Sequence, residues 1–448
     1  MGSIGTLAEF VARLGAGPLP EETADRVARH VLDTAGALLA GSRVPDGSAL
    51  GRLAAGLGSG GGVPLFGHSL ESSLAPAVLA LCGAARCTEV DDIHLPSCTT
   101  PGSVSVPTAL ALAAAGYLPE PPRFLAAVAA GYEVLVRVGL ALDGARALYR
   151  GVWPTYAAAA PGAAAVAACA LELDPGRTAH ALATALTLTA GAAGRIRTSP
   201  SSRWLTLGLA AQNGVTAALA ARDGFLGDEG VFDREGGPLH ELFPAKARLV
   251  EGLGNGYLVE EVSLKPYPTA RQALAAVEAF RQLLAEGLEP GEVEEAIVRV
   301  PPVYAGMIDQ SDPPAARLDS LLNVRYQIAL AAYHPERLVD VVRAELPADE
   351  RVRSLMARIR VEPSPELEEL YPRLWPARVE VRLPGRSVTR ETTVLPWDSG
   401  GGAGWPEVEE KFRRVTAIFA EERSAGIIEA ARGLKRLGST RALLELLG

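Results

Sequence analysis

The first half of the chain is a succession of blocks in which small apolar residues recur at helical spacing. Between residue 7 and about residue 222 each block is a dozen or more residues long, and glycine or proline marks each junction. Aromatic residues make up only 5% of the chain while alanine and glycine are abundant, which favours closely packed helices over a β-sandwich. The blocks span residues 24–40, 75–86, 106–116, 122–142, 161–173, 179–191 and 207–222. We therefore predict a large helical domain.

The pattern changes after about residue 255, where alternating polar and β-branched residues appear. Strands are predicted for 293–300, 356–362, 377–383 and 387–394, and helices for 271–286 and 323–332. The glycine-rich residues 399–404 then precede amphipathic helices at 407–420 and 425–437. This order predicts a mainly α protein, in which a large all-helical domain (1–262 and 401–448) is interrupted by an α+β lid domain (263–400).

The charge of the chain excludes a nucleic-acid partner. The 448 residues carry a net charge of -9, and the basic residues form no concentrated stripe of the kind that a phosphate backbone requires. Most basic residues are arginine, and lysine occurs only at positions 246, 265, 411 and 435. Lys265 therefore stands out by rarity as the lysine inside a distinctive motif.

Cysteine usage and hydropathy indicate a reducing, aqueous environment. The four cysteines, at positions 82, 87, 98 and 169, lack metal-finger spacing, so we expect reduced thiols. Residues 155–173 come nearest to a membrane span, but Pro161-Gly162 interrupts them and Glu172 ends them, which favours a buried helix. The first fifteen residues contain Glu9 and no basic region ahead of an apolar run. We expect a cytoplasmic protein with no membrane partner.

Residues 88–103 hold the densest group of reactive side chains, between two blocks of small residues. A loop set on a rigid helical frame is a frequent place for functional groups. Asp91, Asp92 and His94 allow three interpretations: a metal site, acid/base work by His94 or an aspartate, or carboxylates that cap turns and hold the loop. Three ligands at so tight a spacing make the metal site the weakest of these, and the other two stay open.

The same loop resembles the signature of the MmgE/PrpD family, which includes 2-methylcitrate dehydratase, cis-aconitate decarboxylase and iminodisuccinate epimerase. The likeness rests on Ala-Ala at 84–85, Val-Asp-Asp-Ile-His at 90–94 and Thr-Pro-Gly-Ser-Val at 100–104. It extends over nearly the whole chain. Further similar segments are 32–41, 131–134, 208–214, 223–227 and the Lys-Pro-Tyr-Pro of 265–268.

The resemblance implies a helical domain with an α+β lid inserted before the C-terminal helices, as the residue pattern predicts. It further implies a homodimer, a small carboxylate substrate, and chemistry without metal or cofactor.

The chain departs from the family's pattern where the lyases handle protons. Thr100 stands where the signature loop has a histidine before Pro-Gly, and Trp153 stands where a second motif has another. In a third motif Arg203 replaces a lysine and Thr206 a histidine, and Leu274 replaces the histidine that follows the Lys-Pro-Tyr-Pro motif. The groups now at these positions do not titrate near neutrality.

Arginines and polar residues are left to bind the substrate. Arg203 and Arg271, and with them Arg195 and Arg197, are candidates to hold carboxylates, because a guanidinium matches the carboxylate fork and stays charged. The aligned motifs add Asp91, Thr100, Tyr267 and Trp153 as substrate-binding residues. The catalytic candidates are Lys265, His94, Asp92 and Tyr326.

These residues favour an epimerase or isomerase that moves a proton beside a carboxylate of a small di- or tricarboxylate. In a two-base mechanism Lys265 serves one face of the carbon, and His94, Asp92 or Tyr326 the other. The first alternative is a dehydratase or decarboxylase of a citrate-like or cis-aconitate-like acid. The second is a homodimer that binds a carboxylate without turnover.

Overall fold

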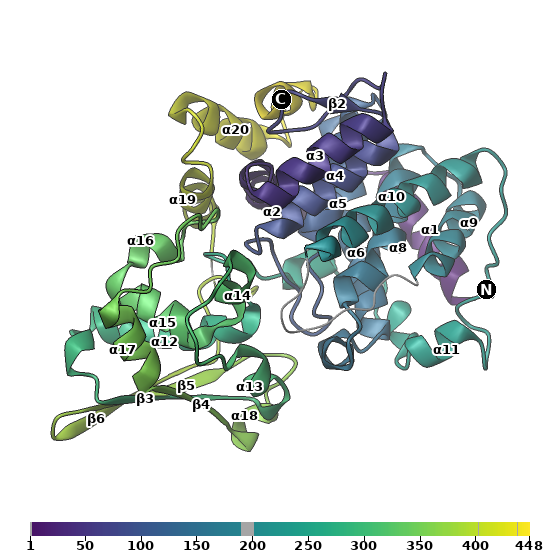
Figure 1. Ribbon diagram of the computed structural model, residues 1–448. Coiled ribbons are helices and arrows are strands. Elements are labelled where there is room, and N and C mark those ends of the chain that lie inside the picture. The colour runs from purple at the N-terminus through teal and green to yellow at the C-terminus, as the bar shows by residue number, and fades with distance from the viewer. Residues whose placement is uncertain (1, 190–200, 402, 437) are drawn as a thin grey trace. The chain divides into compact units, whose positions relative to one another are not determined.

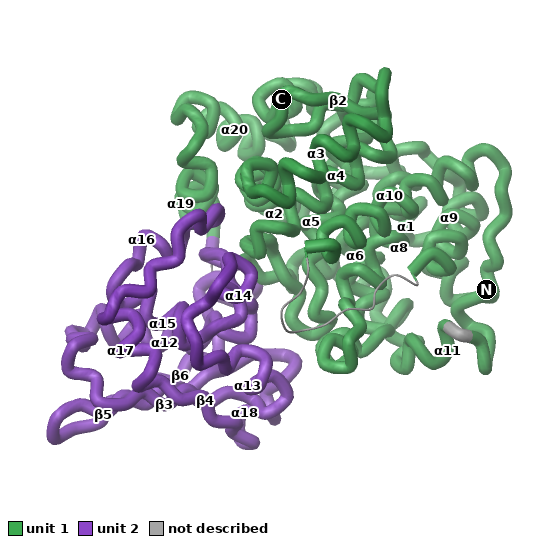
Figure 2. The backbone as a smooth tube through the Cα atoms, in the orientation of Figure 1, with its two compact units in different colours: residues 1–194, 200–264, 404–448 green, residues 195–199, 265–403 purple. Residues whose placement is uncertain are grey.

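The computed structural model describes residues 2–189, 201–401, 403–436 and 438–448. The chain forms two compact units (Figure 2). The first contains residues 1–194, 200–264 and 404–448, and the second contains 195–199 and 265–403. The second unit is therefore inserted between two parts of the first.

The first unit is built from helices (Figure 1). Its α-helices are α1 (Ser3–Gly15), α2 (Glu21–Gly41), α3 (Pro45–Leu57), α4 (Leu74–Cys87), α5 (Gly102–Ala114), α6 (Pro121–Ala141), α7 (Gly144–Ala147), α8 (Pro154–Ala170), α9 (Pro175–Thr187), α10 (Ser202–Arg222), α11 (Pro238–Leu242), α19 (Trp405–Val415), α20 (Glu421–Gly433) and α21 (Arg441–Leu447). Three 3-10 turns, η1 (Leu148–Arg150), η3 (Lys246–Leu249) and η4 (Leu258–Glu261), join them. The unit also contains a hairpin of two-residue strands, β1 (Val63–Pro64) and β2 (Glu71–Ser72), and two isolated β-bridges, Ile93 with Ser263 and His94 with Thr99.

The small side chains let these helices approach closely. Every residue of α8 is buried, and α8 packs against both α6 and α10, while α10 also packs against α4. A Cβ atom at Gly214 of α10 would lie 2.1 Å from the carbonyl oxygen of Ala160 in α8. Glycine at this position is therefore required by contact between two backbones rather than by a turn.

Local chemistry sets where the helices begin. Proline occupies one of the first two positions of α3, α6, α8 and α9, where its missing N–H costs no hydrogen bond. The Asp174 carboxylate caps α9 by accepting a hydrogen bond of 2.9 Å from the backbone N–H of Arg177.

The second unit combines one sheet with short helices. Its helices are α12 (Arg271–Ala285), α13 (Pro302–Ile308), α14 (Arg317–Leu322), α15 (Val324–Tyr333), α16 (Pro335–Leu338), α17 (Glu350–Arg358) and α18 (Pro365–Glu368), with the 3-10 turn η5 (Pro290–Glu292). Its strands are β3 (Glu295–Val300), β4 (Ile359–Pro363), β5 (Ala377–Leu383) and β6 (Arg386–Thr392). The predicted fold class is confirmed: a mainly α protein with a large helical domain and an inserted α+β domain.

The sheet has the strand order β4-β3-β5-β6, with β3 and β4 parallel and the other pairs antiparallel. In β5 the side chains of Ala377, Val379, Val381 and Leu383 are buried in strict alternation with more exposed ones. Helix α12 packs against β5 and β6, and α15 packs on α12 (Figure 1). The unit therefore has a sheet covered by helices. Helix α12 begins six residues after Lys265 in the sequence.

One predicted strand begins too early. The strand expected at 356–362 starts at Ile359, because helix α17 continues to Arg358. The Asp349 carboxylate caps α17 by accepting from two backbone N–H groups, and Val352, Leu355 and Met356 form a buried stripe at helical spacing. The cap and this stripe extend the helix over residues whose side chains also suit a strand.

Helix α6 is long and apolar enough to cross a membrane, by length and composition alone. However, 94% of its most apolar window is buried inside the protein, where it packs on α8. Residues 155–173, expected to be a buried helix, lie mostly in α8, which is buried throughout.

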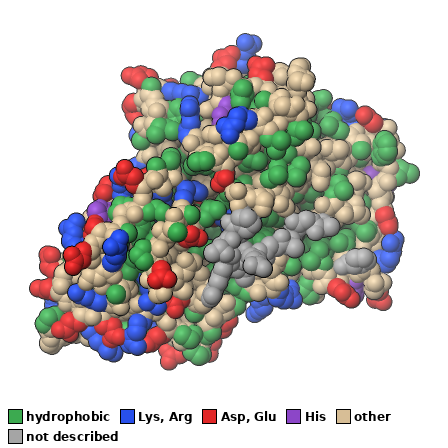
Figure 3. Space-filling model, viewed as in Figure 1, with side chains coloured by type: hydrophobic (Ala, Val, Ile, Leu, Met, Phe, Trp, Pro, Cys, Tyr) green, Lys and Arg blue, Asp and Glu red, His purple; other side chains and the backbone are tan. Residues whose placement is uncertain are grey.

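The visible surface differs between the units. Figure 3 shows basic and acidic side chains intermixed over the α+β unit, whereas hydrophobic side chains gather over the helical unit. Exposed leucines on α3 and α10 include Leu53, Leu57 and Leu209.

We predict that Gly214→Ala destabilises the protein by about 1–3 kcal/mol, because its methyl group overlaps the carbonyl of Ala160 and forces α8 and α10 apart. Urea unfolding followed by circular dichroism measures the change. Gly56→Ala in α3 is the matched control, because none of the described residues comes within 4 Å of the added methyl. That control should gain about 0.5–1 kcal/mol. Equal effects of the two substitutions would contradict the contact argument.

Candidate active site

The loop that joins α4 to α5 is anchored at Asp92. This carboxylate is fully buried and accepts hydrogen bonds from the backbone N–H of Gly102 (2.9 Å) and from the hydroxyl of Tyr132 (2.6 Å). The Nδ1 atom of His30 lies 2.9 Å from the same carboxylate. Burial lowers the pKa of His30 and, with Asp92, raises the pKa of Tyr132 well above its usual range. Asp92 therefore ties the loop to α2, α5 and α6.

A second anchor holds the loop just before the two aspartates. The Nζ atom of Lys411, from α19, lies 2.5 Å from Asp33 Oδ1 on α2 and donates to the carbonyl oxygen of Val90 at 2.8 Å. Burial raises the pKa of Asp33 to about 6, although Lys411 opposes this rise. A helix near the C-terminus thus fixes the backbone next to Asp91.

His94 has an oriented imidazole ring. The backbone N–H of Ser97 donates to its Nδ1 at 3.3 Å, and the Ser97 hydroxyl lies 2.9 Å from the same atom. Its Nε2 lies 3.5 Å from a carboxylate oxygen of Glu261, whose side chain is 63% exposed. The contact with His94 lowers the pKa of Glu261. A buried imidazole with one nitrogen fixed and the other facing a carboxylate is suited to proton transfer.

Asp91 belongs to a different group from Asp92. Its carboxylate lies 3.2 Å from Arg86 Nη1, and the same guanidinium atom lies 2.6 Å from Glu89 Oε2. The other oxygen of Glu89 contacts Nη2 of Arg203. Burial by itself lowers the pKa of Arg86, but Asp91 and Glu89 outweigh it and raise that pKa. Among the residues that the structure describes, two arginines and two carboxylates thus form a nearly buried network of opposite charges.

Aromatic side chains hold Arg203 in place. Its guanidinium carbon lies 3.8 Å from the centre of the Trp204 ring and 5.2 Å from that of Trp153. Trp153 in turn stacks on Tyr156, with ring centres 5.6 Å apart and an angle of 16° between the planes. Cation–π contacts of this kind orient a guanidinium while leaving its N–H groups available.

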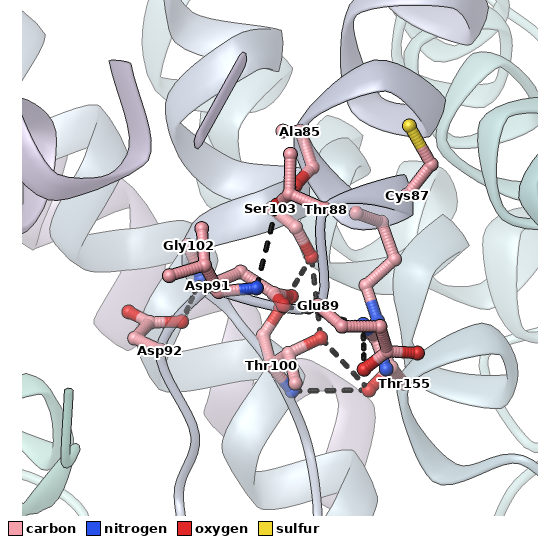
Figure 4. Close-up of polar contacts among 12 residues, drawn as sticks. Ala85, Cys87, Thr88, Glu89, Asp91, Asp92, Thr100, Gly102, Ser103 and Thr155 are labelled. Carbon is pink, nitrogen blue, oxygen red and sulfur yellow. Dashed lines mark hydrogen bonds and ion pairs between the residues drawn. The ribbon is translucent and has the colours of Figure 1, made fainter. Parts of the chain in front are cut away.

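Threonines and a serine close the remaining side of this group. The Thr155 hydroxyl accepts from the backbone N–H of Thr100 at 3.0 Å, and the two threonine hydroxyls lie 3.2 Å apart. Thr100 also contacts the Ser103 hydroxyl at 3.2 Å. Figure 4 shows Thr100 and Thr155 pointing toward each other near Glu89, while Asp92 lies apart beside Gly102.

No group of three or more metal-binding side chains is assembled anywhere in the described residues. The three side chains weighed as metal ligands turn to separate partners. Asp91 contacts Arg86, Asp92 takes the anchoring bonds described above, and His94 faces Ser97 and Glu261.

The candidates in the α+β unit are also held by ion pairs. Arg271, the first residue of α12, donates through Nη2 to both oxygens of Asp398 at 2.9 and 3.1 Å. Its Nε and Nη1 are buried and have no hydrogen-bond partner in the described part of the chain. The Tyr267 hydroxyl donates to Glu278 at 2.7 Å, and burial raises its pKa well above the usual range. The Nε and Nη1 atoms of Arg271 therefore have no acceptor among the described residues, whereas the Tyr267 hydroxyl already has one.

Tyr326 and Lys265 are both buried in this unit. The Tyr326 hydroxyl has no hydrogen-bond partner among the residues described, and burial raises its pKa to about 12. The nearby charge of Arg343 opposes that rise, and Arg343 itself donates to the carbonyl oxygen of Pro268 at 2.8 Å. Arg195 and Arg197 lie outside the described residues.

Comparison with known proteins assigns both units to one family. A family model for the MmgE/PrpD N-terminal domain matches residues 5–248, and one for the MmgE/PrpD C-terminal domain matches residues 267–436. The chain belongs to the MmgE/PrpD family. It is also 24% identical, over 466 aligned positions, to the cis-aconitate decarboxylase-like protein oryM of Aspergillus oryzae (strain ATCC 42149 / RIB 40). That similarity covers 98% of this chain and 96% of oryM.

The structure brings together four of the MmgE/PrpD candidates from the helical unit. Asp91, Thr100, Trp153 and Arg203 gather around one network, while Asp92 and His94 take separate partners. The side chains that join them were not predicted as site residues from the sequence, and neither was His30, the partner of Asp92. These joining side chains are Arg86, Glu89, Tyr156 and Trp204.

Some of these residues carried a signal. Arg86 and Glu89 are three residues apart at the end of α4, a spacing that suits an ion pair, and Tyr156 ends the motif that contains Trp153. His30 carried none, because its contact with Asp92 joins residues 62 positions apart.

Asp33 should make part of the stability of this MmgE/PrpD protein dependent on pH. An aspartate whose pKa is raised in the folded protein binds its proton more tightly when folded. This contribution is therefore full below about pH 4 and is lost as the pH rises through about 6. Between pH 4 and pH 7 the protein should lose about 2–3 kcal/mol of stability relative to Asp33→Asn.

Urea unfolding of both proteins at several pH values measures this difference, with Asp228→Asn as a control for the loss of an exposed carboxylate. A difference between wild type and Asp33→Asn that stays constant over this range would contradict the prediction.

Proposed function

We propose that this protein is an epimerase or isomerase that transfers a proton at the carbon beside a carboxylate of a small di- or tricarboxylate, without a cofactor. The observation that carries the proposal is the network around Arg203. By the resemblance, Thr100, Trp153 and Arg203 stand where the lyases of the family have histidine or lysine. Here Thr100 hydrogen-bonds to Thr155, while Arg203 contacts the Trp153 ring and pairs with Glu89. The helical unit keeps its means of binding carboxylates but not the lyase histidines.

Arginines supply the electrostatic part of the reaction. Removing a proton beside a carboxylate places negative charge on the carboxylate oxygens, and guanidinium groups stabilise that charge. Arg203 in the helical unit and Arg271 in the α+β unit both have buried N–H groups without a described partner. Each is therefore suited to holding one carboxylate in both ground state and transition state.

Lys265 and His94 are the proton-transfer groups that we propose. One removes the proton, leaving its electron pair in the enediolate, and the other returns a proton to the opposite face of the carbon. His94 is favoured over Asp92 because its ring is oriented and its Nε2 lies 3.5 Å from the Glu261 carboxylate. The Asp92 carboxylate, in contrast, is already surrounded by Gly102, Tyr132 and His30. The hydroxyl of Tyr326 has no hydrogen-bond partner among the described residues, so Tyr326 is the alternative acid.

A lyase is the second candidate function. The full-length similarity to a cis-aconitate decarboxylase-like protein favours it, since the alignment covers nearly all of both chains. Under this proposal His94 would perform the proton transfer of a missing family histidine. A dehydratase would release water and leave an alkene, and a decarboxylase would release carbon dioxide and return a proton to the carbon.

We expect purified, chelator-treated protein in deuterium oxide to exchange a carbon-bound proton of at least one carboxylate from a panel. The panel contains iminodisuccinate, citrate, 2-methylcitrate and cis-aconitate, and proton NMR follows each reaction. Exchange or loss of optical activity with the carbon skeleton of the substrate unchanged supports the epimerase. New alkene signals or loss of a carboxylate would favour the lyase, and silence across the panel would count against both.

On the substrate that reacts, Lys265→Ala and His94→Gln should each lower kcat by about 100-fold or more, as expected for loss of a general acid or base. Lys246→Ala, which removes a partly exposed lysine over the buried ring of Phe232, is the matched control and should retain the rate. Full activity of either active-site variant would remove that residue from the mechanism.

A further inference from the structure

Glu89 binds the two arginines of the helical unit as a ligand carboxylate would. We propose that Arg86, Arg203 and Tyr156 form a subsite for one carboxylate of the substrate, and that Glu89 fills this subsite until the substrate displaces it. The identity of the ligand as a carboxylate rests on the proposed function. The subsite itself is argued from the contacts of Glu89 and from its unpartnered neighbours.

The two oxygens of Glu89 are shared between the two guanidinium groups. Oε2 lies 2.6 Å from Arg86 Nη1, and Oε1 contacts Arg203 Nη2. A carboxylate between two arginines is the arrangement by which proteins bind dicarboxylic and tricarboxylic acids. Glu89 therefore marks where a substrate carboxylate would bind.

The subsite contains more hydrogen-bond donors than Glu89 uses. In the described part of the chain, four buried donors in this network have no acceptor: Arg86 Nε, Arg203 Nε, Tyr156 Oη and Trp204 Nε1. A buried donor without an acceptor is unfavourable, so such donors are rarely left unpaired without a reason. A ligand with several carboxylate oxygens would supply acceptors that one glutamate side chain cannot.

The Tyr156 hydroxyl lies within this field of charge. The charges that act on it are those of Arg203, Arg86, Glu89 and Asp91. Burial raises the pKa of Tyr156 to about 12, so that its hydroxyl keeps its proton and remains a donor at neutral pH. Tyr156 is thus a fixed hydrogen-bond donor toward an anion.

The arginines have other contacts that would keep them in place after Glu89 leaves. Asp91 still holds Arg86 at 3.2 Å, and the rings of Trp153 and Trp204 still flank Arg203. The exchange also preserves charge, because one incoming carboxylate replaces one departing carboxylate. The subsite is therefore preorganised, which lowers the cost of binding.

Glu89 is suited to leaving. Its side chain is 11% exposed, at the end of α4, and its backbone has a φ of 58°, in the left-handed region that a glutamate seldom adopts. Glu172 provides a matched comparison. It has a φ of 52° and an ion pair with Arg123 at 2.8 Å, but its side chain is 72% exposed.

The test is isothermal titration calorimetry with citrate as the probe, at constant ionic strength, on the full chain. Because a neutral amide lacks the charge that competes with the ligand, Glu89→Gln should bind citrate about tenfold more tightly than wild type. Tyr156→Phe should bind it about three- to tenfold more weakly, through loss of one charge-assisted hydrogen bond. Glu172→Gln and Tyr117→Phe, outside the network, should match wild type.

If the ion pairs of Glu89 had a purely structural role, Glu89→Gln would bind citrate more weakly than wild type rather than more tightly. If Glu89→Gln binds citrate no more tightly than wild type, or if neither protein binds it, the proposal is wrong. If Glu89→Gln does not fold, Glu89→Asp replaces it, because aspartate keeps the charge but is too short to reach both arginines equally well. Glu89→Asp should bind citrate with an affinity between those expected for wild type and Glu89→Gln. An affinity equal to that of wild type would overturn the proposal.

Failure of the proposed reaction is distinguishable from failure of the subsite. If Glu89→Gln binds citrate more tightly but wild type exchanges no proton, the subsite proposal is supported and the epimerase proposal is contradicted.

Discussion

The buried charge of Asp92 is the interaction on which the site depends. An aspartate placed inside an alanine-rich helical core must find donors, and it takes them from Gly102 on α5, Tyr132 on α6 and His30 on α2. These three bonds fix the path of the loop. Asp91, one residue earlier, is thereby turned toward Arg86 and the arginine network. The position of Asp91 and its contact with Arg86 therefore depend on where the neighbouring Asp92 carboxylate finds its hydrogen-bond donors.

The two units hold different groups of candidate residues. The helical unit provides a network of fixed charge, whose arginines are balanced by Glu89 and Asp91 and held by indole rings. The α+β unit provides Lys265, Arg271 and the Tyr326 hydroxyl. The arginine, tryptophan and threonine side chains of the helical unit's network do not titrate near neutrality, which is why we propose that this network binds a ligand rather than transfers a proton.

The fold was largely predictable from the sequence, whereas the site was predictable only in part. Helical spacing and glycine or proline breaks locate α2, α4, α6 and α10, and alternation locates β5, because these signals are local. The start of β4 was misplaced because a cap and a buried stripe carry α17 into residues that also suit a strand. Motifs singled out Asp91, Thr100 and Arg203, but the contact of His30 with Asp92 depends on packing between segments distant in sequence, which no local pattern reports.

The close contact between α8 and α10 has a consequence for how such a protein diversifies. Every position of α8 is buried, and backbone meets backbone where Gly214 faces Ala160. Almost no larger side chain fits there, so the scaffold has little tolerance for substitution. Glu89, Thr100 and Trp153 lie in the segments between helices, so a change of side chain there does not meet this backbone contact. The density of the core thus directs tolerated change toward these segments.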